Sequence, residues 1–204
     1  MLVIRRRNSE GEAASFRNCA DLHAASGSYS GSVIFDSSGI EKIGAIDIHI
    51  PNDDICAASF KDCKQLKVAE GIFPGWVDFS ESGVESFGSL AITEPTEQGL
   101  AASFDQCRNL KEARGLFPGF VCFDGSGVTT IRDLTIFNPD EDGRYASFQD
   151  CTFLDLGEVA KSQLEQIIEL NFDGIAEAAK KALITLKKRE KVKEIGRTQP
   201  EIEI

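Results

Sequence analysis

The chain has 204 residues, a formal net charge of −11 and a pI near 4.7. The hydrophobic fraction of 42% and the charged fraction of 27% are those of a globular protein. The acidic excess argues against a nucleic-acid partner, whose phosphates require a basic surface, and no apolar run reaches the ~20 residues of a membrane span. The apolar first residues precede Arg5, Arg6 and Arg7, the reverse of a signal peptide. This order predicts a cytoplasmic protein, and a fragment of a larger secreted effector or surface protein is the alternative.

The sequence repeats with a period of 44 residues. The pattern Ser-Phe-x-x-Cys-x-x-Leu recurs at this step, and its phenylalanines are Phe16, Phe60, Phe104 and Phe148. Four copies begin at residues 13, 57, 101 and 145, after a lead-in at 1–12, and they end near residue 156. Regular self-similarity of this length indicates a solenoid, in which each unit stacks on its neighbours.

Each copy contains two strand signals separated by turn residues. The first is Val-x-Phe followed by a serine and two apolar residues, as in VIFDSSGIEKI (33–43), VDFSESGVESF (77–87) and VCFDGSGVTTI (121–131). We expect its serines (Ser38, Ser82 and Ser126) to bond backbone groups where the coil turns. The second signal is Leu/Ile-x-Ile, at 46–48, 90–92 and 134–136, and each is followed by a proline-containing loop. Each 44-residue unit is therefore expected to make two coils of roughly 20 to 24 residues.

The combined pattern resembles the BspA-like class of leucine-rich repeats. In that class an Ala-Phe-x-x-Cys-x-x-Leu segment alternates with Val-x-x-Ile-Gly. The matching residues of the second copy are Ala58, Phe60, Cys63, Leu66, Val84, Phe87 and Gly88. The resemblance covers residues 13–156 and departs from the class at the Gly-x-Phe-Pro-Gly insert. We therefore expect a mainly β, right-handed solenoid of leucine-rich type with irregular outer segments. A square β-helix of pentapeptide repeats is a rival, but its next central residue would be Gln65, whereas the apolar residue is Leu66.

Four of the six cysteines occupy one phase of the repeat. With two coils between successive copies at ~4.8 Å each, these cysteines would lie about 10 Å apart, beyond the ~7 Å limit for a disulfide. Equal spacing along a stack also prevents four ligands from converging on one metal ion. We expect reduced thiols packed in the core, and no metal or cofactor.

No catalytic motif accompanies either histidine, so we expect a protein that is not an enzyme. The predicted function is protein binding by a rigid stacked surface, with a basic protein as the partner. The residues predicted to contact it are Trp76, Asp78, Ser80, Glu81, Phe120 and Asp124. Proline-containing loops predict a second acidic edge, made of Asp53, Asp54, Glu94, Glu97, Asp140, Glu141 and Asp142.

Two other functions remain open at this point. An enzyme would need a site built across the coils, in a polar pocket that includes His49. An acidic DNA mimic would need a square β-helix with a continuous carboxylate face.

A further stack of aromatic residues, Tyr29, Phe73 and Phe117, is predicted to lie in the core.

The composition becomes helical after the last copy. Residues 157–195 are predicted to form a C-terminal helical cap, with helices at 161–170 and 175–195. The first helix is expected to cover the last coil. The second carries an apolar stripe through Ile175, Ala179, Leu183 and Leu186, and it is a candidate for capping, self-association or partner binding. Residues 196–204 are expected to be a disordered tail.

Overall fold

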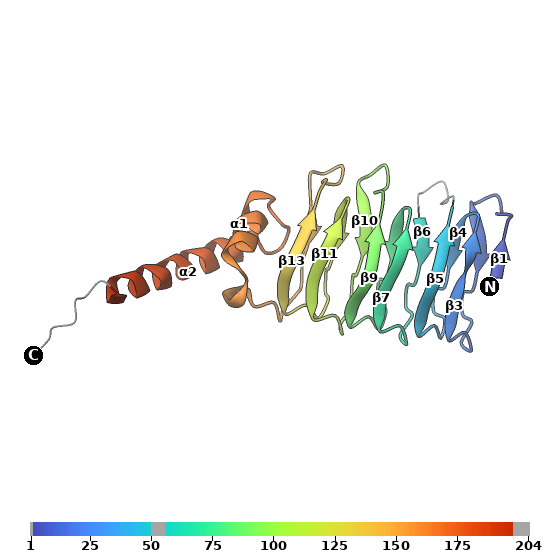
Figure 1. The fold of residues 1–204 in the computed structure, drawn as a ribbon, viewed down its shortest axis with the longest axis horizontal. Helices are drawn as coiled ribbons and strands as arrows, with labels where there is room; N and C mark the ends of the chain where they lie inside the picture. Colours follow the sequence, from blue (N-terminus) through green and yellow to red (C-terminus); the bar gives the residue numbers. More distant parts are fainter. Residues whose placement is uncertain (1, 50–55, 198–204) are drawn as a thin grey trace, which may run out of the picture.

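The computed structural model describes residues 2–49 and 56–197, and the chain forms a parallel β-solenoid followed by two helices (Figure 1). One side is a continuous sheet of seven short parallel strands, which we call the short-strand sheet. Its members are β2 (Glu12–Ser15), β4 (Ser32–Ile34), β6 (Cys56–Ser59), β8 (Trp76–Asp78), β10 (Leu100–Ser103), β12 (Phe120–Cys122) and β14 (Ala146–Ser147).

The opposite side, which we call the long-strand side, also consists of parallel strands. Here β1 (Leu2–Ile4), β3 (Ala24–Tyr29) and β5 (Lys42–Ile48) form one sheet; β7 (Val68–Phe73) pairs with β9 (Ser86–Ile92), and β11 (Glu112–Phe117) pairs with β13 (Thr130–Ile136). The prediction of a β-solenoid is confirmed. The prediction of irregular outer segments is wrong, because each coil carries a strand on both sides.

A glycine within the strand explains why half of these strands were missed. In β7, Ala69 and Phe73 are buried and Ile72 points outward, but the register shifts between Ala69 and Gly71. Gly71 has φ +120°, a conformation that a side chain rarely allows. The extra residue lies in β9, between Phe87 and Leu90, whereas in β7 the glycine leaves no apolar side chain midway between Ala69 and Phe73, so the period-two alternation cannot be recognised in the sequence. Gly115 has φ +119° at the same place in β11.

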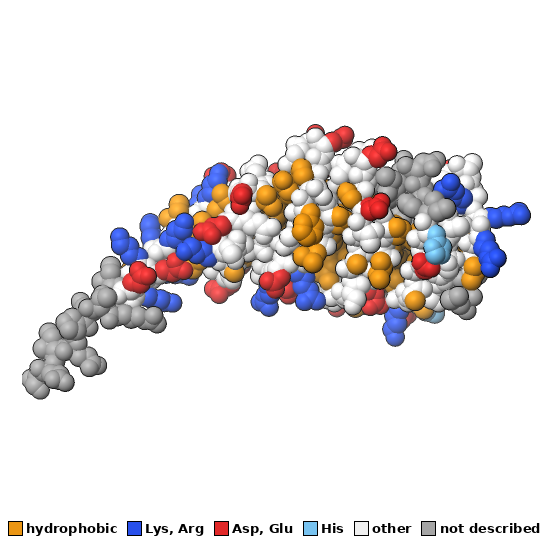
Figure 2. Space-filling model, turned by 45° about the horizontal axis from the view of Figure 1, so that its top comes forward, with side chains coloured by type: hydrophobic (Ala, Val, Ile, Leu, Met, Phe, Trp, Pro, Cys, Tyr) orange, Lys and Arg blue, Asp and Glu red, His pale blue; other side chains and the backbone are white. Residues whose placement is uncertain are grey.

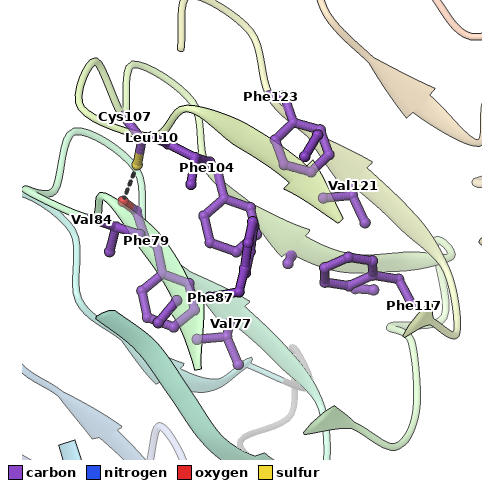
Figure 3. Packing of buried hydrophobic residues seen from close by; sticks show 14 of the residues in the cluster. Val77, Phe79, Val84, Phe87, Phe104, Cys107, Leu110, Phe117, Val121 and Phe123 are labelled. Carbon is purple, nitrogen blue, oxygen red and sulfur yellow. Dashed lines mark hydrogen bonds between the residues drawn. The ribbon is translucent and has the colours of Figure 1, made fainter. Parts of the chain in front are cut away.

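A single column of phenylalanine rings runs through the core (Figure 3). Neighbouring rings are nearly parallel, with centroids 4.9 to 6.1 Å apart. In stacking order the column contains Phe16, Phe35, Phe60, Phe79, Phe104, Phe123, Phe148 and Phe172. The phenylalanines of the Ser-Phe-x-x-Cys and Val-x-Phe segments therefore alternate in one stack, so the two segments fill the same place in successive coils. Tyr29, Phe73 and Phe117 are buried, as predicted.

The recurring cysteines and serines also alternate at one corner of the coil. The Sγ atoms of Cys63 and Cys107 donate to the carbonyl oxygens of Phe35 and Phe79, both at 3.0 Å. Ser82 Oγ lies 3.5 Å from Cys107 Sγ. The prediction that these serines bond the backbone is therefore wrong. The cysteine thiol donates to the backbone carbonyl, and the serine hydroxyl lies beside the cysteine sulfur.

None of the six cysteines, all of which are described, forms a disulfide. Burial raises the pKa of Cys107 to about 11 and that of Cys122 to about 12. Cys19, in the first coil, is instead exposed. A cysteine at this position of the repeat is therefore not always a core residue.

The C-terminal segment covers the last coil with a side-chain amide and an aromatic ring. Helix α1 (Lys161–Glu169), which follows a short 3₁₀ turn at Leu156–Glu158, presents Gln163 to the edge of β13. The Gln163 side chain accepts from Leu134 N at 3.1 Å and donates to Leu134 O at 3.2 Å, as a neighbouring strand would. Asp173 N donates to Ala146 O at 2.8 Å, and Phe172 continues the ring column. Residues 171–174 thus add a final rung, although the sequence indicates only a break between helices.

Helix α2 (Ala176–Arg197) begins against the last coil and then extends away from the solenoid (Figure 1). Ala179 is buried, and Leu183 and Leu186 pack partly against the core. The predicted tail at 196–204 begins within this helix, and residues 198–204 lie outside the described residues. Neither described helix combines the length and the apolarity needed to cross a bilayer.

Candidate functional site

Three of the predicted binding residues gather around a fourth carboxylate on the outer surface of the short-strand sheet. Asp78 is the last residue of β8 and pairs in register with Ser103 of β10. Asp105 comes two residues after Ser103. Asp124 occupies the place of Asp105 in the next coil, because the rings that precede them, Phe104 and Phe123, are stacked. We call Asp78, Glu81, Asp105 and Asp124 the acidic face.

Electrostatic repulsion is concentrated at Asp105. Its pKa is raised by partial burial and then by the neighbouring charges of Asp124, Glu81 and Asp78, while Lys61 acts in the opposite direction. Lys61 Nζ lies 3.4 Å from Glu81 Oε1, so this cation is already engaged. At Asp105, three carboxylates therefore act against a single cation.

Short hydrogen bonds hold the carboxylates of the acidic face in place. Asp78 Oδ1 accepts from Ser80 N at 2.8 Å, and Asp124 Oδ1 accepts from Gln149 N at 2.8 Å and from the hydroxyl of Ser147. Ser80 itself is buried, and its Oγ lies 2.8 Å from Ser103 Oγ. Ser80 therefore braces the sheet and is not presented to a partner, in contrast to the prediction.

The two predicted aromatic anchors are not free at the surface. Phe120 is buried, and the guanidinium of Arg144 lies 5.2 Å from the centre of its ring. Trp76, at the start of β8, is half-buried. Phe120 was predicted to contact a partner, but its ring is covered because the loop that carries Arg144 folds back over β12.

The predicted acidic loop edge is only partly exposed. Asp140 has a side chain that is 2% exposed, and it accepts from Arg144 Nε at 2.9 Å and from the backbone of residues 142 and 144. It is a loop-forming residue, not part of a charged ridge. The exposed members are Glu94, Glu97, Glu141 and Asp142, while Asp53 and Asp54 lie outside the described residues.

The histidines do not form a catalytic arrangement in the described residues. His49 follows β5, and its Nε2 lies 3.0 Å from Ser28 Oγ and 3.1 Å from Asp47 Oδ2. A hydrolytic triad needs the acid and the nucleophile on different ring nitrogens, whereas here both meet the same atom. His23 pairs with Glu41 at 3.0 Å on the surface. No group of three His, Cys, Asp or Glu side chains in the described part of the chain is placed to hold a metal ion.

The long-strand side carries an apolar feature that the sequence reading missed. Ile72 on β7, Leu116 on β11 and Phe137 after β13 are 65%, 64% and 62% exposed, and we call them the apolar row. Figure 2 shows hydrophobic side chains over this part of the solenoid. A groove beside Leu116 is lined by Phe87, Leu90, Arg114, Phe117 and Asp133. Ile72 and Leu116 each follow one of the glycines Gly71 and Gly115, which left their strands unrecognised in the sequence, and Phe137 comes directly after the end of β13.

Replacing Asp105 with asparagine is expected to stabilise the fold at neutral pH. The raised pKa means that the carboxyl group of Asp105 holds its proton more tightly in the folded chain than in the unfolded chain. The folded state therefore loses stability as pH rises through the folded pKa of Asp105. Asparagine removes this penalty, and the advantage should vanish below the ordinary pKa of about 3.9. Thermal melts of Asp105→Asn and wild type at pH 7 and pH 3 measure the difference, with Glu97→Gln as an exposed control. A gain in Tm of the same size at both pH values would contradict this origin.

The site that emerges is a charged surface and not a cavity with reactive groups. Its residues come from three adjacent strands, β8, β10 and β12, and from the turns that follow them. Comparisons of the chain with protein-family models, with curated proteins and with solved structures find no match.

Proposed function

We propose that this protein is a non-enzymatic protein-binding scaffold that receives a basic segment of a partner on its acidic face. The observation that carries the proposal is the clustering of Asp78, Glu81 and Asp124 around Asp105, whose pKa is raised by partial burial and by these three charges, with Lys61 acting in the opposite direction. Like charges held together by a rigid sheet cost stability, and a basic ligand offsets that cost. The chain's net charge of −11 adds long-range attraction for the same partner.

We further propose that the solenoid is of the leucine-rich, BspA-like type with a 44-residue unit of two coils. Support comes from the pairing of the short strands. Val77 pairs with Ala58 on one side and on the other with Ala102, the residue that is equivalent to Ala58 one period later. The Cys and Ser positions alternate in the same way at the corner of the coil. Such solenoids present extended binding surfaces, which agrees with the proposed role.

The two other functions considered from the sequence receive less support. The contacts of His49 lack the geometry of a triad, and this residue is exposed. A DNA mimic would need unbroken rows of carboxylates, but the row that contains Asp105 and Asp124 also contains Lys61, Ser80 and Gln149. Each coil has one short and one long strand, which differs from the four short sides of a square β-helix.

The proposal is tested with a labelled oligolysine peptide of twelve residues, titrated against the full chain by fluorescence anisotropy. The double variant Asp105→Asn/Asp124→Asn is expected to weaken binding roughly tenfold, because two partly exposed charge pairs together contribute on the order of 1.4 kcal/mol. The double variant keeps side-chain size, so the ring column beneath it should be preserved.

The matched control is Glu94→Gln/Glu97→Gln, which removes the same two charges from exposed positions on a loop. If this pair weakens binding as much as the acidic-face pair, the peptide responds to net charge alone and the proposed surface is wrong. Equal loss in both would therefore reject the site, whereas a loss confined to Asp105 and Asp124 supports it.

A further inference from the structure

Charge is distributed very unevenly along this chain. Helix α2 contains eight Lys and Arg and three Glu, a formal charge of +5. Since the whole chain has a charge of −11, the residues outside α2 carry −16. Figure 2 shows Lys and Arg side chains gathered along the helix. The basic residues are concentrated in its second half, at 187–193, which we call the basic segment.

The basic segment has an unoccupied face in the described structure. Ile184, Lys188, Lys191 and Val192 share one side of the helix, because they are spaced by three, four, seven and eight residues. Ile184 and Val192 are 54% and 69% exposed. The other side, through Ala179 and Leu186, is the one that packs toward the solenoid.

Within the described residues, no ion pair joins a cation of the basic segment to a carboxylate. The acidic residue of the segment, Glu190, pairs with Lys161 of α1 at 3.5 Å. The helix leads away from the coils of its own chain, so the basic segment is directed away from the acidic face of the same molecule (Figure 1). The attraction between the two surfaces can therefore be satisfied only between molecules.

We propose that the exposed face of α2 docks on the acidic face of a second copy of this chain. This inference rests on the proposed function and names its basic partner. The charges are complementary, and the lengths agree as well. Seven helical residues span about 10 Å, and the three strands β8, β10 and β12 span about 10 Å at ~4.8 Å per strand. Ile184 and Val192 share this face with the lysines, so their burial in the contact would add to the electrostatic term.

A second copy fits this helix better than other anionic partners do. A nucleic acid or an anionic membrane would attract the basic segment, but it would repel the rest of the chain, which carries −16. The acidic face of another copy attracts the same segment with carboxylates over a matching length, and each copy also brings a basic segment, which offsets part of the repulsion between two chains of −11. The association is expected to weaken as salt rises, because exposed charges are screened beyond about 10 Å at 0.1 M.

The test is sedimentation velocity of the full chain across concentrations at 50 mM and 500 mM NaCl. Self-association is expected at low salt and should be weakened at least tenfold by the reversal Lys187→Glu/Lys188→Glu/Lys191→Glu, as expected for several exposed pairs. The reversal Asp105→Lys/Asp124→Lys should have the same effect. A mixture of the two variants should form a complex again, since the unaltered acidic face of the first can receive the unaltered basic segment of the second.

The matched control is Arg5→Glu/Arg6→Glu/Arg7→Glu, which changes the net charge equally at the opposite end of the chain. An equal loss in this control would overturn the inference. So would a chain that is monomeric in both salts, or an assembly that survives 500 mM salt and is abolished by Leu116→Glu in the apolar row. Binding of the chain to phosphatidylserine vesicles through Lys187, Lys188 and Lys191, without self-association, would also overturn it. Oligolysine binding by a chain that stays monomeric would leave the proposed function standing and reject only this inference.

Discussion

Replacing Phe104 with alanine is expected to reduce the free energy of unfolding by about 4 kcal/mol, the cost typical of removing a buried phenylalanine. The ring is fully buried and lies in the middle of the column, 5.2 Å from Phe79 and 5.5 Å from Phe123. It also meets the rings of Phe87 and Phe117 edge-on. The neighbours are fixed by two sheets and cannot collapse into the space, so the cavity remains. Urea unfolding followed by circular dichroism measures the loss.

The matched control for this substitution is Phe153→Ala. Phe153 is 72% exposed, and its removal should change the free energy of unfolding by less than about 0.5 kcal/mol. A similar loss for both variants would mean that aromatic content, and not the stacked column, determines the stability of this solenoid.

Replacing Gly83 with alanine is expected to destabilise the fold by about 3 kcal/mol, at the upper end of the range for overpacking. Gly83 N donates to Cys63 O at 3.0 Å, which brings two successive coils together at their common corner. A Cβ atom at this position would lie 2.0 Å from the carbonyl oxygen of Lys64, and backbone atoms cannot move aside as a side chain can. Gly39 and Gly127 meet the preceding coil in the same way, each with a Cβ 1.9 Å from a carbonyl oxygen.

Gly88→Ala provides the comparison for this second substitution. Its Cβ would approach side-chain atoms of Glu70 and Val68 at 3.0 Å, and both of these side chains can adjust. Chemical denaturation of the two variants should therefore give a much larger loss for Gly83→Ala. A stable Gly83→Ala protein, with an unchanged unfolding midpoint, would show that the coils can separate at this corner.

The repeat in the sequence was enough to predict a solenoid, since residues at equal intervals must occupy equivalent places in a stack. It also predicted which half of the strands would be found, because Val-x-Phe and Leu/Ile-x-Ile alternate with period two. The strands that contain Ala-Ser, or a glycine such as Gly71 or Gly115 in place of an apolar residue, carry no such signal. Phe35 and Phe60 were read as members of different segments, and only the three-dimensional structure shows that they are neighbours in one column.

The candidate site was predictable only in part, for a related reason. Asp78, Glu81 and Asp124 were identified because they end or follow recognisable strands, whereas Asp105 lies within the Ser-Phe-x-x-Cys segment and stood out only as a position that differs from Lys61 of the preceding copy. Adjacency across coils depends on register, which the ladder fixes and the period alone does not. The burial of Phe120 depends on Arg144 and its loop, 24 residues further along the chain, and such a contact leaves no local mark in the sequence.

The two sides of the solenoid differ in how their strands are joined, and this gives the molecule a direction in which it bends. The short-strand sheet is hydrogen-bonded through all seven strands, so it resists stretching like an inextensible spine. On the long-strand side, no ladder joins β5 to β7 or β9 to β11 among the described strands. At the second of these joints Arg114 Nη2 donates to Phe87 O at 2.9 Å, which is a side-chain tether in place of a ladder. Flexing would thus occur about the spine by opening these joints, and the groove beside Leu116 would widen when the solenoid curves.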